Sequence, residues 1–211
     1  MLYLTPLGTP NSLGQRYWKG TAACCDFLHV DPDDSAYIRS LMDEISSKYT
    51  VDQRRIYVAG LSNGGFMAQR LACDHSSKIA AMVSVSAVVE YDQTLCQPNQ
   101  KLSVLTVHGT QDTTVKFDGG TLFGGSYPSA TDTFKFWASK NGCSTTATEG
   151  TAFDLENSLA GSETIPYSAT SCPSGIDVNF WKVIGGGHNP RLKSDIPQKI
   201  ITFFLNHPKP L

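Results

Sequence analysis

The fold-determining stretch is Arg55-Ile56-Tyr57-Val58-Ala59-Gly60-Leu61-Ser62-Asn63-Gly64-Gly65-Phe66-Met67-Ala68. Its β-branched start predicts a buried strand over 56–60, and the residues that follow predict a helix over 63–73. Ser62 lies in the sharp turn between them, so its hydroxyl projects at the N-terminus of the helix. Free N–H groups and the helix dipole favour developing negative charge there. The pattern predicts a nucleophile elbow; the alternative is an ordinary glycine-rich turn.

Composition fits a single globular domain over residues 1–211. Hydrophobic residues make up 40% of the chain and the formal net charge is −2. Charges form no long run of either sign, so we expect neither nucleic acid nor an anionic membrane as a partner. The apolar run 79–89 is too short, and too interrupted by serine, to span a bilayer.

Six cysteines stand at positions 24, 25, 73, 96, 143 and 172, and no pair has zinc-finger or C-x-x-C spacing. Their even number favours disulfides in an exported protein, while buried free thiols in a cytosolic protein are the alternative. The residues from Met1 to Pro6 show no basic region and no apolar core of signal-peptide length. At this point a secreted or periplasmic location therefore depends on the cysteines alone.

Strands alternate with helices along the rest of the chain. Leu2–Thr5 predicts a short strand, and residues 8–34 are predicted to form a loop that ends in a helix-start cluster. Residues 141–173, rich in Gly, Ser, Thr and Ala, predict a loop or short-strand excursion. This order predicts an α/β architecture, a mainly parallel sheet covered on both faces. Further helices are expected at 35–49, 131–141 and 196–207, and further strands at 80–87, 102–108 and 178–184.

A serine nucleophile needs a base and an orienting acid, and two loops after predicted strands supply them. Asp112 follows one strand, and His188 follows another after three glycines. In this interpretation His188 takes the Ser62 proton and returns it to the leaving alcohol, while Asp112 holds the imidazole tautomer. The order serine, aspartate, histidine is that of an α/β-hydrolase triad. Asp118 is the alternative acid, and a surface-loop position is the alternative for His188.

The other histidines are expected to be non-catalytic, and His108, before Gly109, is expected to make structural hydrogen bonds. A metal site would need clustered histidine and carboxylate ligands, and the sequence shows no such spacing, so we expect no metal. The remaining histidines are His29, His75 and His207.

Several blocks, in order along most of the chain, match a known group of enzymes. They include Trp18…Ala23-Cys24-Cys25, Val51-Asp52-Gln53-Arg54-Arg55-Ile56-Tyr57-Val58, Gly60-Leu61-Ser62-Asn63-Gly64-Gly65-Phe66-Met67, His108-Gly109-Thr110-Gln111-Asp112 and Gly185-Gly186-Gly187-His188. The chain resembles esterases related to polyhydroxybutyrate depolymerases and feruloyl or acetylxylan esterases. The resemblance implies an α/β-hydrolase three-layer fold, export, and a cofactor-free serine esterase with the same triad. It also implies disulfides involving Cys24-Cys25, Cys73 and the Cys143/Cys172 region, with Cys143–Cys172 as the expected pair.

Two departures from the family pattern affect the expected site. Asn189-Pro190-Arg191 follows the catalytic histidine where the family has a bulky aromatic, which leaves the acyl or alcohol pocket open. The family also carries a strand with a His-Gly loop, then a helix, before the segment matching Leu2–Thr5. This chain starts after them, so the sheet is expected to be N-terminally shortened.

The shortening has two expected consequences. The Asn63 N–H remains as an oxyanion donor, but its usual partner donor is absent, and losing one donor can cost ~10²–10³ in rate. Either the Leu2–Thr5 strand closes the gap in the sheet, or a second copy of the chain covers it in a homodimer.

These features predict a serine esterase that hydrolyses carboxylic esters through an acyl-enzyme. Small acyl, feruloyl-type or short hydroxyalkanoate esters are the expected small-molecule substrates. Trp18 and Phe27 are the expected substrate-binding residues, with simple packing as their alternative role. Two other functions remain open: a catalytically impaired remnant that serves as a binding or structural domain, and an acyltransferase that uses the same triad.

Overall fold

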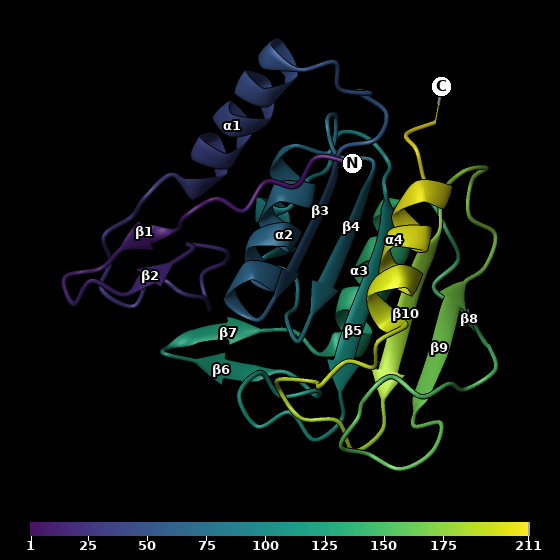
Figure 1. Cartoon of the computed structure of the whole chain (residues 1–211). Coiled ribbons are helices and arrows are strands. Elements are labelled where there is room, and N and C mark those ends of the chain that lie inside the picture. Colours follow the sequence, from purple (N-terminus) through teal and green to yellow (C-terminus); the bar gives the residue numbers. More distant parts are fainter. Residues whose placement is uncertain (211) are drawn as a thin grey trace.

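A computed structural model describes residues 1–210 of the chain. They fold around one six-stranded sheet in the order β3-β4-β5-β10-β9-β8 (Figure 1). The first four strands of this order run parallel, and β9 pairs antiparallel with both of its neighbours. The strands are β3 (Tyr57–Leu61), β4 (Ala81–Val85), β5 (Ser103–Gly109), β8 (Ala147–Glu149), β9 (Thr164–Ala169) and β10 (Val178–Val183).

Helices cover both faces of the sheet. Side chains of α1, α2 and α3 share a core with one face, while α4 packs against the other (Figure 1). The helices are α1 (Asp34–Lys48), α2 (Asn63–Asp74), α3 (Ala130–Lys140) and α4 (Ile196–Asn206). None of the helices in residues 1–210 is long and apolar enough to cross a bilayer. The predicted three-layer α/β arrangement is therefore confirmed.

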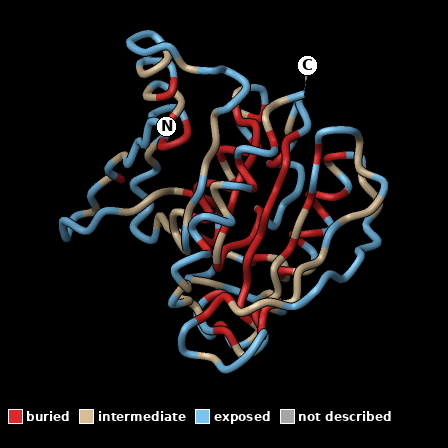
Figure 2. The backbone as a smooth tube through the Cα atoms, turned by 45° about the vertical axis from the view of Figure 1, so that its right-hand side comes forward, coloured by how far each residue is buried: buried red, intermediate tan, exposed pale blue. Residues whose placement is uncertain are grey.

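The central strands β4 and β5 are mostly apolar because both of their faces are buried. On β4, Met82 contributes to the core shared with α2 and α3, and its neighbour Val83 contributes to the core shared with α4. Trp137 of α3 is fully buried and donates from Nε1 to Gln69 Oε1 of α2 at 2.6 Å. Figure 2 shows the buried residues following these central strands, whereas the chain near the N-terminus is exposed.

The prediction of a strand over Leu2–Thr5 is wrong. These residues form no strand, and their side chains are exposed. A strand needs a partner for its backbone groups, and within residues 1–210 β3 pairs with β4 alone. The N-terminal segment therefore does not close the sheet.

Several short elements lie outside the sheet's main strands. A two-stranded hairpin, β6 (Gly120–Leu122) with β7 (Gly125–Tyr127), follows β5 and was not predicted from the sequence. The expected excursion over 141–173 contains β8 and β9. Near the N-terminus, β1 (Thr9–Pro10) pairs with β2 (Arg16–Tyr17), and a 3₁₀ turn spans Gln93–Leu95.

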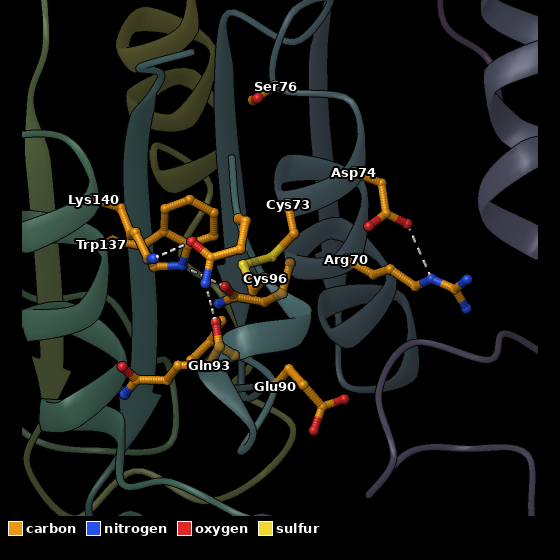
Figure 3. Close-up of a disulfide and its surroundings, with 12 residues drawn as sticks. Arg70, Cys73, Asp74, Ser76, Glu90, Gln93, Cys96, Trp137 and Lys140 are labelled. Carbon is orange, nitrogen blue, oxygen red and sulfur yellow. Dashed lines mark hydrogen bonds and ion pairs between the residues drawn. A yellow bond between two sulfur atoms is a disulfide. The ribbon is translucent and has the colours of Figure 1, made fainter. Parts of the chain in front are cut away.

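All cysteines are paired in disulfides, as the sequence favoured. Cys73–Cys96 ties the last turn of α2 to the segment after β4 (Figure 3). Cys143–Cys172 joins the segment after α3 to the segment after β9, which confirms the expected pair. The third disulfide joins the adjacent residues Cys24 and Cys25.

Candidate active site

Ser62 lies in the turn between β3 and α2 with φ 52° and ψ −120°, a combination that glycine favours and other residues rarely adopt. Two glycines allow this turn. A Cβ on Gly60 would lie 2.0 Å from the Gly64 carbonyl oxygen, and one on Gly65 would lie 2.8 Å from Ala87 Cβ. A Cβ on Gly64 would meet no atom within 4 Å. Within the elbow, the close packing therefore requires glycine at positions 60 and 65 but not at position 64.

The structure brings the three predicted triad residues together. Ser62 Oγ lies 2.7 Å from His188 Nε2, and His188 Nδ1 lies 2.8 Å from Asp112 Oδ2. With Nδ1–H donating to the carboxylate, Nε2 is free to accept from the serine hydroxyl. The three side chains come from the loops after β3, β5 and β10, at the carboxyl ends of parallel strands.

Glycines let the loop that carries His188 pass directly over the end of β5. A Cβ on Gly109 would lie 2.2 Å from the Gly186 carbonyl oxygen, and one on Gly186 would lie 2.6 Å from Val183 Cγ1. Gln111 N donates to the same Gly186 oxygen at 2.9 Å. The two loops are therefore bonded to each other, which fixes the distance between His188 and Asp112.

Asp112 is buried and fully engaged. Its Oδ1 accepts the N–H groups of Thr114 and Val115, both at 2.9 Å, while Oδ2 faces His188. Burial alone would raise the pKa of Asp112, but hydrogen bonds from His108, His188 and these two N–H groups hold it well below its ordinary value. His108 Nε2 also donates to the Val115 carbonyl at 2.7 Å, so its predicted structural role is confirmed.

Asn63 joins the elbow to the Trp18–Cys25 segment. Its Oδ1 accepts from Trp18 N at 2.8 Å, and its Nδ2 donates to the Trp18 carbonyl at 2.7 Å. The same Nδ2 lies 3.6 Å from Cys24 Sγ. Asn63 is the first residue of α2, so its backbone N–H has no carbonyl partner within the helix and can donate to another group. The sequence predicts this N–H as an oxyanion donor but carries no local signal for the side-chain contacts, because they join segments far apart in the chain.

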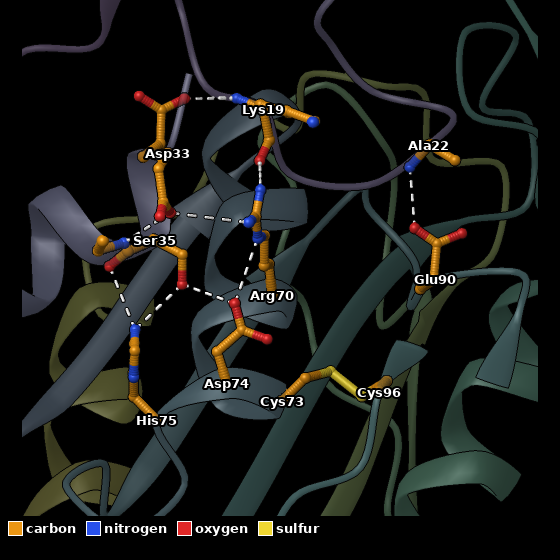
Figure 4. Close-up of polar contacts among 12 residues, drawn as sticks. Lys19, Ala22, Asp33, Ser35, Arg70, Cys73, Asp74, His75, Glu90 and Cys96 are labelled. Atoms are coloured by element: carbon orange, nitrogen blue, oxygen red, sulfur yellow. Dashed lines mark hydrogen bonds and ion pairs between the residues drawn. A yellow bond between two sulfur atoms is a disulfide. The ribbon is translucent and has the colours of Figure 1, made fainter. Parts of the chain in front are cut away.

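Two further contacts hold the Trp18–Cys25 segment in place (Figure 4). Arg70 Nη1 donates to the Lys19 carbonyl at 2.8 Å, and Ala22 N donates to Glu90 Oε2, also at 2.8 Å. Arg70 is itself paired with Asp74, with Nε and Oδ2 3.2 Å apart. The segment is thus fastened to α2 and to the loop after β4.

The two expected substrate-binding residues differ in their surroundings. The Trp18 ring packs against the core and stacks on Tyr37, with ring centroids 6.5 Å apart. Phe27 is exposed and pairs with Phe123 at the tip of the β6–β7 hairpin. Contact of Trp18 and Phe27 with substrate stays a prediction. Within residues 1–210, no group of three His, Cys, Asp or Glu side chains could hold a metal ion.

The chain is similar to several known esterases. The model of the phospholipase/carboxylesterase family matches residues 32–136. Feruloyl esterase B of Piromyces equi is 32% identical over 189 residues, which is 86% of this chain and 32% of that protein. Feruloyl esterase C of Emericella nidulans is 27% identical over 121 residues, 57% of this chain and 40% of that protein.

A bifunctional acetylxylan esterase/xylanase of Neocallimastix patriciarum is 24% identical over 158 residues, 74% of this chain and 21% of that protein. The chain thus spans less than half the length of each of these relatives. Among solved structures, an acetyl xylan esterase from Aspergillus awamori superposes with TM-score 0.57 and 17% identity, over 82% of this chain and 67% of that one. These matches confirm the fold and the predicted resemblance.

Proposed function

This chain is a relative of carboxylesterases and of feruloyl and acetylxylan esterases with an α/β-hydrolase fold, and we propose that it is a serine esterase acting on carboxylic esters. The observation that carries the proposal is the hydrogen-bonded series from Ser62 through His188 to Asp112. A serine hydroxyl becomes a useful nucleophile at neutral pH only beside such an oriented base.

The reaction proceeds in two halves. Ser62 Oγ attacks the ester carbonyl carbon while His188 Nε2 takes the hydroxyl proton. The tetrahedral intermediate collapses, the bond to the alcohol breaks, and His188 returns the proton to the departing alcohol. Water then attacks the acyl group on Ser62 by the same route and releases the acid. Asp112 remains ionised and stabilises the imidazolium formed in each half.

The Asn63 N–H stabilises the oxyanion in this scheme. It lies at the N-terminus of α2, where the helix dipole adds a favourable field. Its side-chain bonds to Trp18 fix the orientation of this first helical residue. Preorganisation of this kind avoids reordering the donor as charge develops on the carbonyl oxygen.

Esters of small, feruloyl-type or short hydroxyalkanoate acids are the proposed substrates. The relatives named feruloyl esterase support the aromatic acyl group within this set. Trp18 and Phe27 are the proposed substrate contacts. Trp18 bonds Asn63 directly, and the exposed ring of Phe27 follows the same segment in the sequence.

Hydrolysis of 4-nitrophenyl acetate by the chain and by its Ser62→Ala variant tests the proposal. The unmodified chain should release nitrophenolate well above the spontaneous rate, and the variant should not. Equal rates would refute the serine esterase and favour a binding or structural domain.

We also propose a location outside the cytoplasm, secreted or periplasmic. Pairing of every cysteine in three disulfides supports it, since such bonds persist in oxidising compartments. Alkylation of the denatured, unreduced protein should modify no cysteine. Modification of several cysteines would contradict this assignment.

A homodimer through the open edge of β3 is the proposed assembly. Ile56 O and Ser62 N bond on the β4 side, so the backbone groups of Tyr57, Ala59 and Leu61 face away from the sheet. Leu61 is 45% exposed at this edge. A free edge of this kind is a template for another strand, and antiparallel pairing of two β3 strands about a two-fold axis would satisfy both.

Light scattering at micromolar concentration should therefore give twice the mass of one chain. Ala59 is exposed, so Ala59→Lys should place charge on the edge and shift the protein to a monomer without unfolding it. A monomeric unmodified chain would contradict the dimer.

A further inference from the structure

Phe123 occupies an unfavourable backbone position at the tip of the β6–β7 hairpin. Leu122 pairs with Gly125, so Phe123 and Gly124 form a two-residue turn, with φ 47° and 92°. Positive φ at both central residues defines a type I′ turn, which favours Asn, Asp or Gly and penalises a bulky side chain. Local backbone energetics therefore do not account for phenylalanine here.

Burial does not account for it either. Phe123 is 75% exposed, and its ring lies against the ring of Phe27, with centroids 3.9 Å apart and planes tilted by 37°. Phe27 is itself 43% exposed. Two large aromatic rings thus meet in solvent, on segments about a hundred residues apart in the sequence.

Both rings stand on firmly held backbone. Asp26 accepts hydrogen bonds from Val30 N at 2.9 Å and Asp31 N at 2.7 Å, which closes the turn that carries Phe27. On the other side, a Cβ on Gly125 would lie 2.5 Å from the Ala22 carbonyl oxygen. The hairpin backbone is therefore seated directly on the Trp18–Cys25 segment.

The hairpin that carries Phe123 packs against the loops that carry Ser62 and Asp112. The hairpin residues Leu122 and Tyr127 pack in one cluster with Phe66 of the first turn of α2 and with Val115 of the Asp112 loop. Lys116 N of that loop donates to the Tyr127 hydroxyl at 3.0 Å. Figure 1 shows the hairpin beside the N-terminal end of α2, where Ser62 stands.

From this geometry we propose that Phe27 and Phe123 determine acyl specificity by stacking on the flat, conjugated acyl group of the substrate. The inference rests on the esterase function proposed above. Strained backbone conformations cluster at functional sites. The positive φ of Phe123, at a side chain that is not buried, therefore points to a functional role for its ring. Ring stacking at a partly exposed site is worth about a tenfold gain in binding, and it discriminates planar acyl groups from flexible aliphatic ones.

Methyl cinnamate and methyl butyrate test the proposal, because they share the alcohol and differ in the acyl group alone. Phe123→Ala should lower kcat/KM for methyl cinnamate about tenfold, mainly through KM, and leave methyl butyrate within about twofold. Phe123→Trp should keep the cinnamate preference. Phe123→Gly, which suits the positive φ, should lose the preference while unfolding at no lower temperature. Tyr49→Ala removes an exposed ring from the end of α1 and should change neither ester.

Equal losses on both esters would overturn the proposal in favour of a structural role for the hairpin. The proposal would also be overturned if Phe123→Ala lowered kcat/KM for an acetylated xylo-oligosaccharide and left kcat/KM for methyl cinnamate unchanged. The rings would then contact the alcohol part of the substrate rather than the acyl group. If the unmodified chain cleaves neither ester, the esterase proposal fails separately. Calorimetry with cinnamamide then tests the subsite alone: Phe123→Ala should weaken its binding about tenfold, and unchanged binding would overturn the subsite.

Discussion

Replacing Ser62 with alanine should lower kcat for ester hydrolysis at least about 10⁴-fold, because the site then lacks the oxygen that attacks the carbonyl. His188 and Asp112 would remain in place, since their own hydrogen bond does not involve Ser62. The triad acts as a unit, so adding His188→Ala to the serine variant should cost little more. Initial rates with 4-nitrophenyl acetate, corrected for spontaneous hydrolysis, measure the effect.

A second substitution at this position separates lost chemistry from lost folding. Ser62→Gly also removes the hydroxyl, but glycine adopts φ 52°, ψ −120° without the strain that any Cβ meets there. Removing this backbone strain stabilises the folded state by ~1–3 kcal/mol. That gain exceeds the ~0.4–1 kcal/mol by which glycine's greater conformational entropy stabilises the unfolded state. Ser62→Gly should therefore be as inactive as Ser62→Ala yet more stable by about 1 kcal/mol in urea unfolding. Lower stability of the glycine variant would show that the elbow is not strained.

The sequence predicted the elements whose periodicity is strong. The helices and the four parallel strands lie within a few residues of their expected bounds. The helices carry an apolar stripe of helical period, and the strands are short apolar runs that alternate with them along the chain. Leu2–Thr5 failed because an apolar run becomes a strand only beside a partner, and partners are set by the tertiary fold. The β6–β7 hairpin escaped prediction since its turn carries Phe123 where Asn or Gly would have signalled it.

The triad was predictable because each member has its own local signature. Ser62 stands in the elbow, Asp112 follows a strand, and His188 follows three glycines. The supporting contacts have no such signature. Asn63 reaches Trp18 across 45 positions, and Phe27 meets Phe123 only through the folding of the hairpin onto the Trp18–Cys25 segment. Pairings of this kind follow from tertiary packing, which a single sequence does not encode locally.

Asp112→Asn should lower kcat by about 10⁴-fold while leaving the fold intact. The two backbone N–H groups that bond Oδ1 require an oxygen there, so the new amide must place its NH₂ at the Oδ2 position. That NH₂ would donate to His188 Nδ1 and force the proton onto Nε2. An imidazole with Nε2–H facing Ser62 cannot accept the hydroxyl proton, so the base is lost although every atom stays close to its place.

Asp118→Asn is the matched control for this variant, because Asp118 lies six residues further along and is exposed. It makes none of the bonds that orient the imidazole, and its kcat should stay within about twofold of the unmodified chain. Steady-state rates for both variants, with unfolding temperatures alongside, complete the comparison. The assignment of Asp112 as the orienting acid would be wrong if Asp112→Asn retained a tenth of the kcat of the unmodified chain. It would also be wrong if Asp118→Asn lowered kcat more than Asp112→Asn does. The hydrogen bonds from Thr114 N and Val115 N would then only close the turn. The lowered pKa of Asp112 argues against that outcome, because it keeps the carboxylate ionised beside His188, as an orienting acid requires.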